Sequence, residues 1–564
     1  MYTRGFILLR RLSTDSKNTK FFTTPIYYVN AKPHIGHLYS SLIADAAQRW
    51  QHVYQKSSLV KFSTGTDEHG SKIQQAAEKN NTTPDKYCDQ ISSDFQKVVS
   101  EFDINCTDFI RTTETRHKDT VAKLWRVLND SNHIYLSKYE GWYCVSDETF
   151  LTESQLKEIT VEDGKKILVS EESGNPVEWS SEENYMFKLS AFQDDLNYWL
   201  KNNEDAIRPK KFHKILLDLI NKDDGLQDLS VSRPTSRVQW GIPVPADSSQ
   251  KVYVWLDALA NYLTVSKYAT DEVTFKKCWP PDVQVIGKDI LKFHGIYWPA
   301  FLLAAKLELP KMIFCHSHWT VNSEKMSKSK GNVVCPIESA KKYTTDGMRY
   351  FLLREGVAHS DGNYSDIKVT RILNSELADT LGNLLSRCTG TALNPKQIFP
   401  KLKSDVLDEM KQIDVTKKLI DSVQKLPDTC RGHYIQLNFY KAIDSVIATL
   451  HVANLFFETL KPWELKKNPE NHGKLDVALH LTLETLRVSC ILLQPIVPNL
   501  ANVVLEKLNV PEDNRYFENV KTFSWNIENS REKPLKPEKV VLFKRILTEE
   551  DTTVKVKKEF TFGL

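Results

Sequence analysis

The hydrophobic pattern near the start of the chain predicts a strand, a turn and a helix. Residues 21–24 (Phe-Phe-Thr-Thr) are typical of a short buried strand, and residues 25–32 of a turn. Residues 34–51 are predicted to form an amphipathic helix, because apolar residues recur there at helical spacing, at Ile35, Leu38, Leu42, Ala46 and Trp50. The positive end of a helix that follows a strand in this way suits a phosphate group.

The pattern changes along the rest of the chain. Turn residues at 163–166 and 173–176 are expected to close hairpins, and residues 252–256 and 283–286 are expected to be strands that resume the first sheet. Beyond about residue 366 glycine becomes rare and apolar residues recur every three or four positions. Helices are therefore predicted over three ranges, 413–423, 442–457 and 477–493.

Length and charge limit the classes of protein that fit. A chain of 564 residues is too long for one core and suggests three or four domains. The 75 basic and 72 acidic residues give a net charge of +3, so any nucleic-acid site must be a local patch. No apolar run approaches the length of a membrane span, and we expect no membrane partner.

The first nineteen residues differ from the rest, because basic and hydroxyl residues surround a short apolar run and the only acid is Asp15. This composition predicts a mitochondrial transit peptide over residues 1–19 and a location in the mitochondrial matrix. A disordered basic tail, or an extension that touches RNA, is the alternative interpretation. A secretory signal fits less well, since the apolar run spans only residues 6–9.

The nine cysteines are scattered, and no two have the C-x-x-C spacing. This arrangement favours a reducing compartment and argues against a structural zinc site, so no protein-bound metal is expected.

Two short segments carry the candidate chemistry. In the first, Pro33-His34-Ile35-Gly36-His37, the two imidazoles can donate hydrogen bonds to phosphoryl oxygens, and Gly36 lets a flat ring approach the backbone. The plainer interpretation is that His34 and His37 only cap the first helical turn. Position after the first strand favours the phosphate interpretation.

The second segment, Lys325-Met326-Ser327-Lys328-Ser329, is followed by Lys330 and Gly331. Ammonium groups on a loop that ends in glycine can neutralise a leaving pyrophosphate. By itself such a stretch is usually a solvated loop. Together the two segments suggest an ATP site that makes an adenylate.

With these segments the chain resembles the class I aminoacyl-tRNA synthetases and, within them, the methionyl-tRNA synthetase family, from about residue 20 onward. Further matching stretches lie at residues 24–30 (TPIYYVN), 65–70 (GTDEHG), 254–258 (VWLDA) and 286–290 (IGKDI). An insertion as short as residues 121–250 disfavours the leucine, isoleucine and valine enzymes, which carry a large hydrolytic domain there.

The resemblance implies an α/β fold with a Rossmann-type parallel sheet as catalytic domain, an inserted connective domain and an all-α anticodon-binding bundle. The expected divisions are listed in chain order: the Rossmann halves at 20–120 and 251–310, separated by the connective insertion at 121–250; a stem-contact segment with the lysine loop at 311–365; and the bundle with its tail at 366–564. Many relatives hold zinc in the connective domain, but the corresponding stretch here offers only Cys144.

Site residues are implied in the same way. The catalytic residues would be His34, His37, Lys325 and Lys328. The ATP-binding residues would be His34, Gly36, His37, Lys288, Asp289, Lys325, Ser327 and Lys328. The methionine-binding residues would be Ile26, Tyr28, Asp67, Trp255, Ala258, Tyr262, Ile290, His294 and Trp298. Asp67 would hold the substrate ammonium group, and the aromatic rings suit a polarizable sulfur. Ordinary core packing is the alternative for these aromatic residues.

Four residues of the bundle would read the anticodon: Asn383, Arg387, Asn454 and Trp463. The first two are four residues apart and share a helix face, and residues 462–463 (Pro-Trp) end the helix that contains Asn454. Stacking and hydrogen bonding are how proteins read unpaired RNA bases. The alternative is structural, with Trp463 closing the end of the bundle and Arg387 paired with an acid.

The expected activity is that of a methionine–tRNA ligase that uses L-methionine, ATP with Mg²⁺ and tRNA(Met). A monomer is expected, because no appended dimerising domain follows the bundle. Two rivals are a smaller nucleotidyltransferase, which would not need the helical half, and a synthetase-derived RNA-binding protein without catalysis, which would have lost active-site residues.

Overall fold

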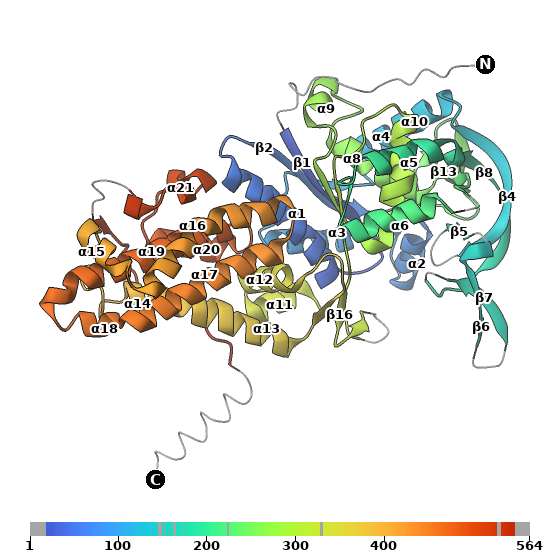
Figure 1. The fold of residues 1–564 in the computed structure, drawn as a ribbon. Helices are drawn as coiled ribbons and strands as arrows, with labels where there is room; N and C mark the ends of the chain where they lie inside the picture. Colours follow the sequence, from blue (N-terminus) through green and yellow to red (C-terminus); the bar gives the residue numbers. More distant parts are fainter. Residues whose placement is uncertain are drawn as a thin grey trace, which may run out of the picture. The chain divides into compact units, whose positions relative to one another are not determined.

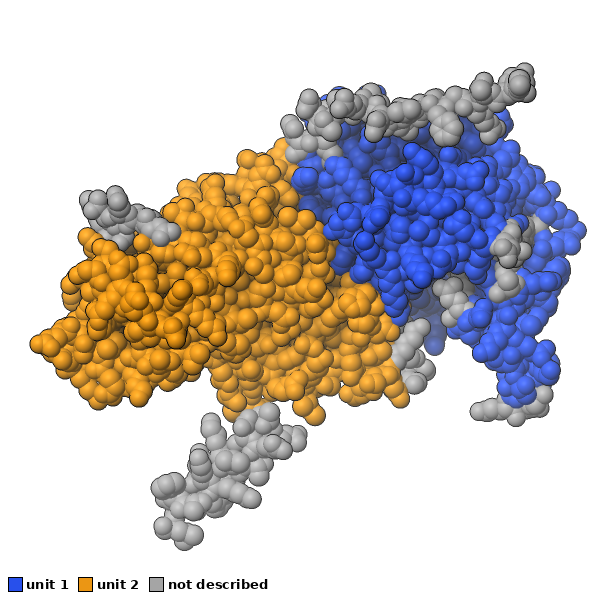
Figure 2. Space-filling model, viewed as in Figure 1, with its two compact units in different colours: residues 1–33, 61–97, 106–316 blue, residues 34–60, 98–105, 317–564 orange. Residues whose placement is uncertain are grey.

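The computed structural model describes residues 19–144, 149–151, 153–161, 165–171, 173–222, 225–326, 331–526 and 532–547 (Figure 1). The chain divides into two compact units, coloured in Figure 2. Unit 1 consists of Met1–Pro33, Lys61–Lys97 and Cys106–His316. Unit 2 consists of His34–Val60, Val98–Asn105 and Ser317–Leu564.

The centre of unit 1 is a six-stranded sheet in the order β3-β2-β1-β14-β15-β9. Its strands are β1 (Thr19–Tyr28), β2 (Leu59–Asp67), β3 (Asp108–Arg111), β9 (Ile207–Arg208), β14 (Val283–Gly287) and β15 (Ile313–His316). β1 pairs with β14, β14 with β15, β15 with β9 and β2 with β3, all in parallel. Every residue of β14 and β15 is buried, as expected for parallel strands covered on both faces.

The order of the strands places a topological switch point beside β1. The chain proceeds from β1 to β2 and β3 on one side, whereas β14 and β15 lie on the other. In open parallel sheets, ligands bind at the carboxyl ends of the strands beside such a point. The predicted strand at residues 283–286 is confirmed as β14.

Helices surround this sheet and its core. They are α2 (Ser71–Lys79), α3 (Pro84–Glu101), α4 (Thr115–Asp130), η2 (Leu189–Phe192), α5 (Gln193–Asn202), α6 (Lys210–Ile220), α7 (Val254–Leu259), α8 (Asn261–Val265), α9 (Glu272–Cys278), η3 (Lys288–Ile290), η4 (Phe293–Tyr297) and α10 (Trp298–Ala304). η4 is a π-helical turn, a feature often found at functional sites.

Antiparallel strands lie between the two halves of the parallel sheet in the sequence. One sheet has the order β10-β8-β4-β5, a second has the order β11-β13-β12, and β6 and β7 form a hairpin. Their bounds are β4 (Ile134–Cys144), β5 (Thr149–Leu151), β6 (Leu156–Thr160), β7 (Lys166–Ser170), β8 (Glu178–Phe187), β10 (Leu229–Ser230), β11 (Ser232–Pro234), β12 (Pro243–Val244) and β13 (Asp247–Val252). The η1 turn is Glu153–Gln155. The expected hairpin near residues 163–166 is confirmed, because Thr160 pairs with Lys166.

Two local predictions are wrong. Residues 252–256 do not form a strand of the parallel sheet, because β13 ends at Val252 and pairs with β11 and β12, and α7 begins at Val254. The turn expected over residues 25–32 begins too early, since β1 continues through Pro25 to Tyr28. The register of β1 with β14 runs through Phe22 and Thr23, ahead of Pro25, so the missing N–H of the proline is not needed there.

Unit 2 begins with α1 (Ile35–Tyr54), which confirms the predicted helix and makes His34 its N-cap. A small sheet of order β17-β16-β18 is built from β16 (Trp319–Val321), β17 (Glu324–Lys325) and β18 (Gly362–Tyr364). It is followed by α11 (Pro336–Tyr343), α12 (Thr345–Glu355), α13 (Asp366–Ile372), the π-helical η5 (Leu373–Gly382) and α14 (Asn383–Thr389).

The rest of unit 2 is a helical bundle that confirms the predicted helical half. Its elements are α15 (Ser404–Met410), α16 (Asp414–Ile435), α17 (Phe439–Leu460), α18 (Pro462–Leu465), η6 (Pro469–Asn471), α19 (His472–Leu493), α20 (Pro498–Lys507), η7 (Glu512–Asn514), α21 (Phe517–Lys521) and η8 (Ser524–Asn526), with β19 (Ile398–Phe399) paired to β20 (Lys533–Pro534). α19 is buried on nearly all sides and packs on α15, α16, α17 and α20, so it is the central helix.

One helical stretch, Phe439–Leu465, is long and apolar enough to cross a membrane by length and composition alone. Core helices pass the same test, and the apolar face of α17 packs against α16 and α19 within the bundle.

Candidate active site

The start of α1 is organised by its two histidines. His34 has an extended backbone, and its Nδ1 accepts a hydrogen bond from the Gly36 N–H at 3.0 Å. The Nδ1 of His37 accepts from the His34 N–H at 3.2 Å, and the two rings stack with centroids 3.8 Å apart. The capping contacts of the plainer interpretation are therefore present, and they also determine which ring nitrogen carries the proton.

A neutral imidazole has one donor and one acceptor nitrogen. Since Nδ1 accepts from the backbone in both rings, the proton of a neutral His34 or His37 must be on Nε2. The cap thus makes Nε2 the hydrogen-bond donor of each neutral ring, and a phosphoryl oxygen requires such a donor.

Gly36 allows this arrangement. A Cβ at this position would lie 2.8 Å from Cε1 of His34, closer than carbon atoms approach, so any side chain would displace the capping ring. The same Cβ position is 3.8 Å from Cε of Met326, which immediately precedes the serine and lysine residues of the second segment.

The described residues on either side of positions 327–330 of the second segment lie beside the start of α1. β16 and β17 form a tight hairpin through Asn322 and Ser323, both with positive φ, and this hairpin positions the backbone of Lys325 opposite Thr320. After the segment, the carbonyl of Val334 accepts a hydrogen bond from the Ile35 N–H at 3.1 Å. The structure therefore brings the two motifs together within unit 2.

Residues 327–330 lie outside the described residues, and with them the expected ATP-binding residues Ser327 and Lys328. The backbone of Lys325 is described as part of β17.

In unit 1, several expected site residues gather at the carboxyl ends of the parallel strands. Tyr28 ends β1 and Asp67 ends β2, and the N–H of Val29 donates to the Asp67 carbonyl at 3.0 Å. Lys288 and Asp289 follow β14 directly in η3. A Cβ at Gly287 would lie 2.5 Å from Oδ1 of Asp289, so glycine is needed for this carboxylate to fold back over the strand end.

Tyr262 and His294 form a buried hydrogen-bonded pair. Because a backbone carbonyl can only accept, Nδ1 of His294 donates to the Ile290 carbonyl at 3.0 Å, and Nε2 then accepts from the Tyr262 hydroxyl at 2.8 Å. Burial lowers the pKa of His294 to about 4, so the ring is neutral at physiological pH. The expected pocket residues Tyr262, Ile290 and His294 are thus in direct contact.

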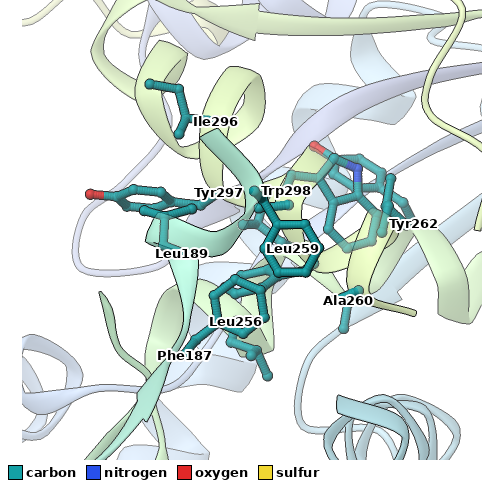
Figure 3. Close-up of a cluster of buried hydrophobic side chains, with 14 of the residues drawn as sticks. Phe187, Leu189, Leu256, Leu259, Ala260, Tyr262, Ile296, Tyr297 and Trp298 are labelled. Atoms are coloured by element: carbon teal, nitrogen blue, oxygen red, sulfur yellow. The ribbon is translucent and has the colours of Figure 1, made fainter. Parts of the chain in front are cut away.

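Trp298 lies beside this pair, with its ring centroid 5.8 Å from that of Tyr262, and both side chains are fully buried (Figure 3). They belong to one hydrophobic cluster with Leu256 and Leu259 of α7, as the alternative of core packing predicts. The indole N–H of Trp298 finds no acceptor in the described part of the chain.

Trp255 and Ala258 are presented by α7. The ring of Trp255 stacks on Phe293 of η4 at 3.6 Å, with an interplanar angle of 15°. Ile26 and Tyr28 of β1 lie outside the hydrophobic cluster of Tyr262 and Trp298. Ile26 packs on a separate cluster around Phe21, and Tyr28 packs on another around Tyr27. Sequence reasoning missed Phe293, although it adjoins His294 and is the natural stacking partner for an indole.

The four expected anticodon residues gather on the bundle. The Arg387 guanidinium lies 4.8 Å from the ring of Phe457 and 5.5 Å from that of Trp463, and it pairs with Glu458 at 2.7 Å. Nδ2 of Asn454 donates to the carbonyl of Thr380, three residues before Asn383. The ion pair that the structural alternative predicts for Arg387 is therefore present, on a surface where Asn383 is exposed.

Within the described residues, no group of three or more His, Cys, Asp or Glu side chains has the arrangement of a metal site. Cys144 is buried at the end of β4.

Comparison with known proteins agrees with this geometry. The family model for tRNA synthetases class I (M) matches residues 20–389, and the model for the anticodon binding domain of methionyl tRNA ligase matches residues 407–561. The mitochondrial methionine–tRNA ligase of Homo sapiens is 48% identical over 88% of this chain and 84% of its own length. A probable mitochondrial methionine–tRNA ligase of Dictyostelium discoideum is 43% identical, covering 94% of this chain and 93% of its own length.

Solved structures agree as well. The Mycobacterium tuberculosis methionyl-tRNA synthetase in complex with methionyl-adenylate matches with a TM-score of 0.86 and 34% identity, over 94% of this chain and all of that one. With both motifs meeting at the start of α1 and a helical bundle following, this chain belongs to the methionyl-tRNA synthetases of the class I aminoacyl-tRNA synthetase family.

Proposed function

We propose that this protein is a methionine–tRNA ligase of mitochondrial protein synthesis. It activates L-methionine with ATP to methionyl-adenylate and pyrophosphate, and then transfers the methionyl group to the terminal adenosine of tRNA(Met). The observation that carries the proposal is the meeting of the two motifs: Met326 and Val334, on either side of residues 327–330, both approach the first turn of α1.

In the first step a carboxylate oxygen of methionine attacks the α-phosphorus of Mg²⁺-bound ATP. The bond from the α-phosphorus to the bridging oxygen breaks, and that oxygen leaves with pyrophosphate. The Nε2–H groups of His34 and His37 donate to the phosphoryl oxygens as charge develops. Lys325, Ser327 and Lys328 bind the departing pyrophosphate, and Gly36 leaves room for the nucleotide. Donors aimed at developing charge are worth about 10²–10³ in rate each.

The remaining nucleotide and methionine contacts come from the carboxyl ends of the strands. Lys288 and Asp289 bind the ribose, and Asp67 holds the substrate ammonium group. The thioether lies among the residues of the methionine pocket: Ile26, Tyr28, Trp255, Ala258, Tyr262, Ile290, His294 and Trp298. The Tyr262–His294 hydrogen bond fixes both rings, so the pocket selects by shape and sulfur contact, which rejects an analogue one methylene shorter by roughly ten- to two-hundred-fold.

In the second step a hydroxyl of the terminal tRNA adenosine attacks the methionyl carbonyl carbon, and AMP leaves. The anticodon bases bind Asn383, Arg387, Asn454 and Trp463, with Trp463 stacking on one base. The ring contacts of Arg387 hold its guanidinium plane beside that indole.

The wider setting is proposed on the same basis. Residues 1–19 direct the protein to the mitochondrial matrix, in keeping with the mitochondrial relatives. Residues 20–120 and 251–310 form the catalytic domain, 121–250 the connective insertion, 311–365 the stem-contact segment and 366–564 the anticodon-binding region. The protein is a monomer without structural zinc and without a membrane partner, which native mass and metal content test directly.

The test is methionine-dependent exchange of labelled pyrophosphate into ATP, followed by charging of tRNA(Met). We expect exchange with L-methionine but not with L-leucine or L-isoleucine, and a labelled methionyl-tRNA product. Exchange without charging would favour the smaller nucleotidyltransferase. Absence of exchange in a folded protein that binds tRNA would favour the RNA-binding protein without catalysis.

A further inference from the structure

A buried carboxylate in unit 1 joins two histidines that the mechanism above does not use. Asp257 is fully buried in α7. Its Oδ2 lies 2.7 Å from Nδ1 of His69, and its Oδ1 lies 2.7 Å from Nε2 of His117. His117 is fully buried in α4, and 4% of the His69 surface is exposed. A carboxylate with both oxygens held by imidazoles is a rigid connection among three segments of the chain.

The electrostatics of this cluster keep the carboxylate charged. Burial alone would raise the pKa of Asp257, but the charges and hydrogen bonds of His69 and His117 lower it to about 2. An ionised carboxylate only accepts hydrogen bonds, so both imidazole nitrogens donate to it. Hydrogen bonds of this charge-assisted kind are about twice as strong as neutral ones.

The connection joins the two halves of the proposed methionine site. Asp257 lies in α7 between Trp255 and Ala258, which line the thioether pocket. His69 follows Asp67, the proposed ammonium ligand, by two residues. Asp257 therefore ties the α7 wall of the pocket to the loop of Glu68 and His69, which directly follows the proposed ammonium ligand at the end of β2.

The loop is also held from its other side, through Glu68. The Glu68 N–H donates to Oγ1 of Thr112 at 2.9 Å, and its carboxylate accepts from Nε of Arg111 at 2.7 Å and from Oγ1 of Thr113 at 2.5 Å. These bonds hold the loop against β3 and the segment that follows it. Trp240 holds the loop as well, since its indole donates to the Glu68 carbonyl at 2.6 Å and its own carbonyl accepts from the Gly70 N–H at 3.0 Å. The His69–Asp257 bond connects the loop to α7.

The far side of the cluster is anchored in the same way. The other ring nitrogen of His117 lies 3.0 Å from Oγ1 of Thr264 in α8, so α4 supports α7 and α8 together. Removing the carboxylate would leave two buried imidazoles without their shared partner, and the loop and α7 could then move independently.

We propose that Asp257 is a positioning residue for methionine: through His69 it fixes the spacing between Asp67 and the α7 wall of the pocket, so that the ammonium and thioether groups bind at once. This inference rests on the proposed function and names what sets the affinity of that site for its amino acid. Asp257 does not touch the substrate in this account.

The test compares two inhibitors that differ only in the ammonium group: L-methioninol and the same alcohol without its amine. Inhibition constants for both are measured against methionine in pyrophosphate exchange. The ratio of the constant for the amine-free alcohol to the constant for L-methioninol gives the preference of the site for the ammonium group. This ratio reports how well the ammonium and thioether sites act together, and it does not depend on the amount of active enzyme. A substitution that merely lowers stability leaves this ratio unchanged.

Four variants sharpen the comparison. Asp257→Asn removes the charge but keeps the shape. His69→Gln withdraws the donor from the Nδ1 position, whereas His69→Asn restores a donor close to it. His480→Gln is the matched control, since that imidazole is also buried and has two partners, the carbonyl of Pro400 and Oγ of Ser524, but lies in the bundle of unit 2.

We expect the ratio to fall about ten-fold in Asp257→Asn and His69→Gln, as the loss of a charge-assisted hydrogen bond predicts, and to stay within two-fold of the wild type in His69→Asn and His480→Gln. The Michaelis constant for ATP should change less than that for methionine. A wild-type ratio in both Asp257→Asn and His69→Gln would overturn the inference. If the wild-type protein showed no methionine-dependent exchange, the proposed function itself would fail instead.

Discussion

At the scale of single residues, the site uses histidine in two opposite tautomers. His34 and His37 accept at Nδ1 from the backbone, which leaves Nε2 as the donor of each neutral ring. His294 instead donates from Nδ1 to a carbonyl and accepts at Nε2 from Tyr262. The sequence identified all three residues but not their tautomers, because these depend on which backbone group each ring meets.

The tautomer of His37 leads to a test with two amides. In His37→Asn the amide oxygen can replace Nδ1 as the acceptor of the helix cap, but the outer donor is lost. In His37→Gln the longer side chain can keep the bond to the His34 N–H, because glutamine is a usual capping-box residue at this N3 position, and its amide N–H₂ extends toward the outer donor position. We therefore expect His37→Asn to keep its melting temperature and to slow adenylate formation by about a hundred-fold or more.

His37→Gln should also keep its stability, since glutamine caps a helix from the N3 position, and should show a smaller loss of rate than His37→Asn. Thermal unfolding and single-turnover kinetics measure the two effects separately. A faster Asn variant than Gln variant would contradict the assignment of the donor to Nε2.

The buried His294 predicts a specific pH dependence. Its pKa in the folded protein, about 4, lies below the value of about 6.5 for an exposed imidazole. The unfolded chain therefore binds the proton first, and stability from this residue is complete above pH 6.5 and decreases as the pH falls toward 4. The Michaelis constant for methionine should accordingly be flat from pH 8 to 5 and rise near pH 4. An inflection near pH 6.5 that disappears in His294→Gln would show that the ring titrates normally and is not buried as described.

At the scale of helices and strands, α1 is attached to the rest of unit 2 by a buried arginine. Arg349 of α12 is fully buried, and its guanidinium donates to Oδ2 of Asp45 in α1 at 2.7 Å. It also donates to the carbonyls of Phe102, Pro495 and Ile496 at 2.9 to 3.1 Å. One side chain thus holds together the helix with the histidine cap, the end of α3 and the loop before α20.

Breaking this attachment should be costly. Arg349→Met removes one of the two arginines that pair with the buried Asp45, since Arg49 stays 2.8 Å from the same oxygen, and loss of a partner from a buried pair typically costs about 3–5 kcal/mol. Denaturant unfolding should show a destabilisation of this size, and Asp45→Asn combined with Arg349→Met should recover part of it. A loss below about 1 kcal/mol would mean that Arg349 does not hold α1.

The bundle surface makes a separate prediction about tRNA. Trp463→Ala should raise the Michaelis constant for tRNA by about ten-fold, because base stacking contributes about 1–3 kcal/mol, and should leave pyrophosphate exchange unchanged. Glu458→Gln is the control, since it releases Arg387 from its ion pair without removing a proposed RNA contact. Aminoacylation kinetics with tRNA(Met) measure both. Equal effects of Trp463→Ala on exchange and on charging would point to a structural role for the indole.

Elements with a strong, uniform pattern were predictable, and short ones were not. The helix periodicity identified α1, α16, α17 and α19, and the apolar run at residues 283–286 identified β14. Residues 252–256 have strand-forming composition, yet α7 starts at Val254, where Asp257 bonds to His69 and His117. His69 lies 188 positions before Asp257 and His117 lies 140 positions before it, and a local sequence pattern cannot detect partners at such separations.

At the scale of the whole molecule, the sequence indicated the fold class and the pairing of the two motifs, and the structure supplies their meeting within unit 2. The resemblance implies the residues of the proposed methionine pocket. It did not reveal the network of Asp257, His69 and His117, or the stacking of Phe293 on Trp255. These contacts hold the proposed site residues in place, and the spacing of the sequence motifs does not predict them.

The central claim is that the histidine cap and the lysine segment act on one triphosphate during methionine activation. Single-turnover formation of methionyl-adenylate and pyrophosphate tests it most directly, in the wild type, His37→Asn, Lys328→Ala and the double variant. We predict rapid, methionine-dependent adenylate formation in the wild type and a slowing of about a hundred-fold or more in each single variant, with the Michaelis constant for methionine unchanged. Adenylate formation at the wild-type rate in either single variant would contradict the account.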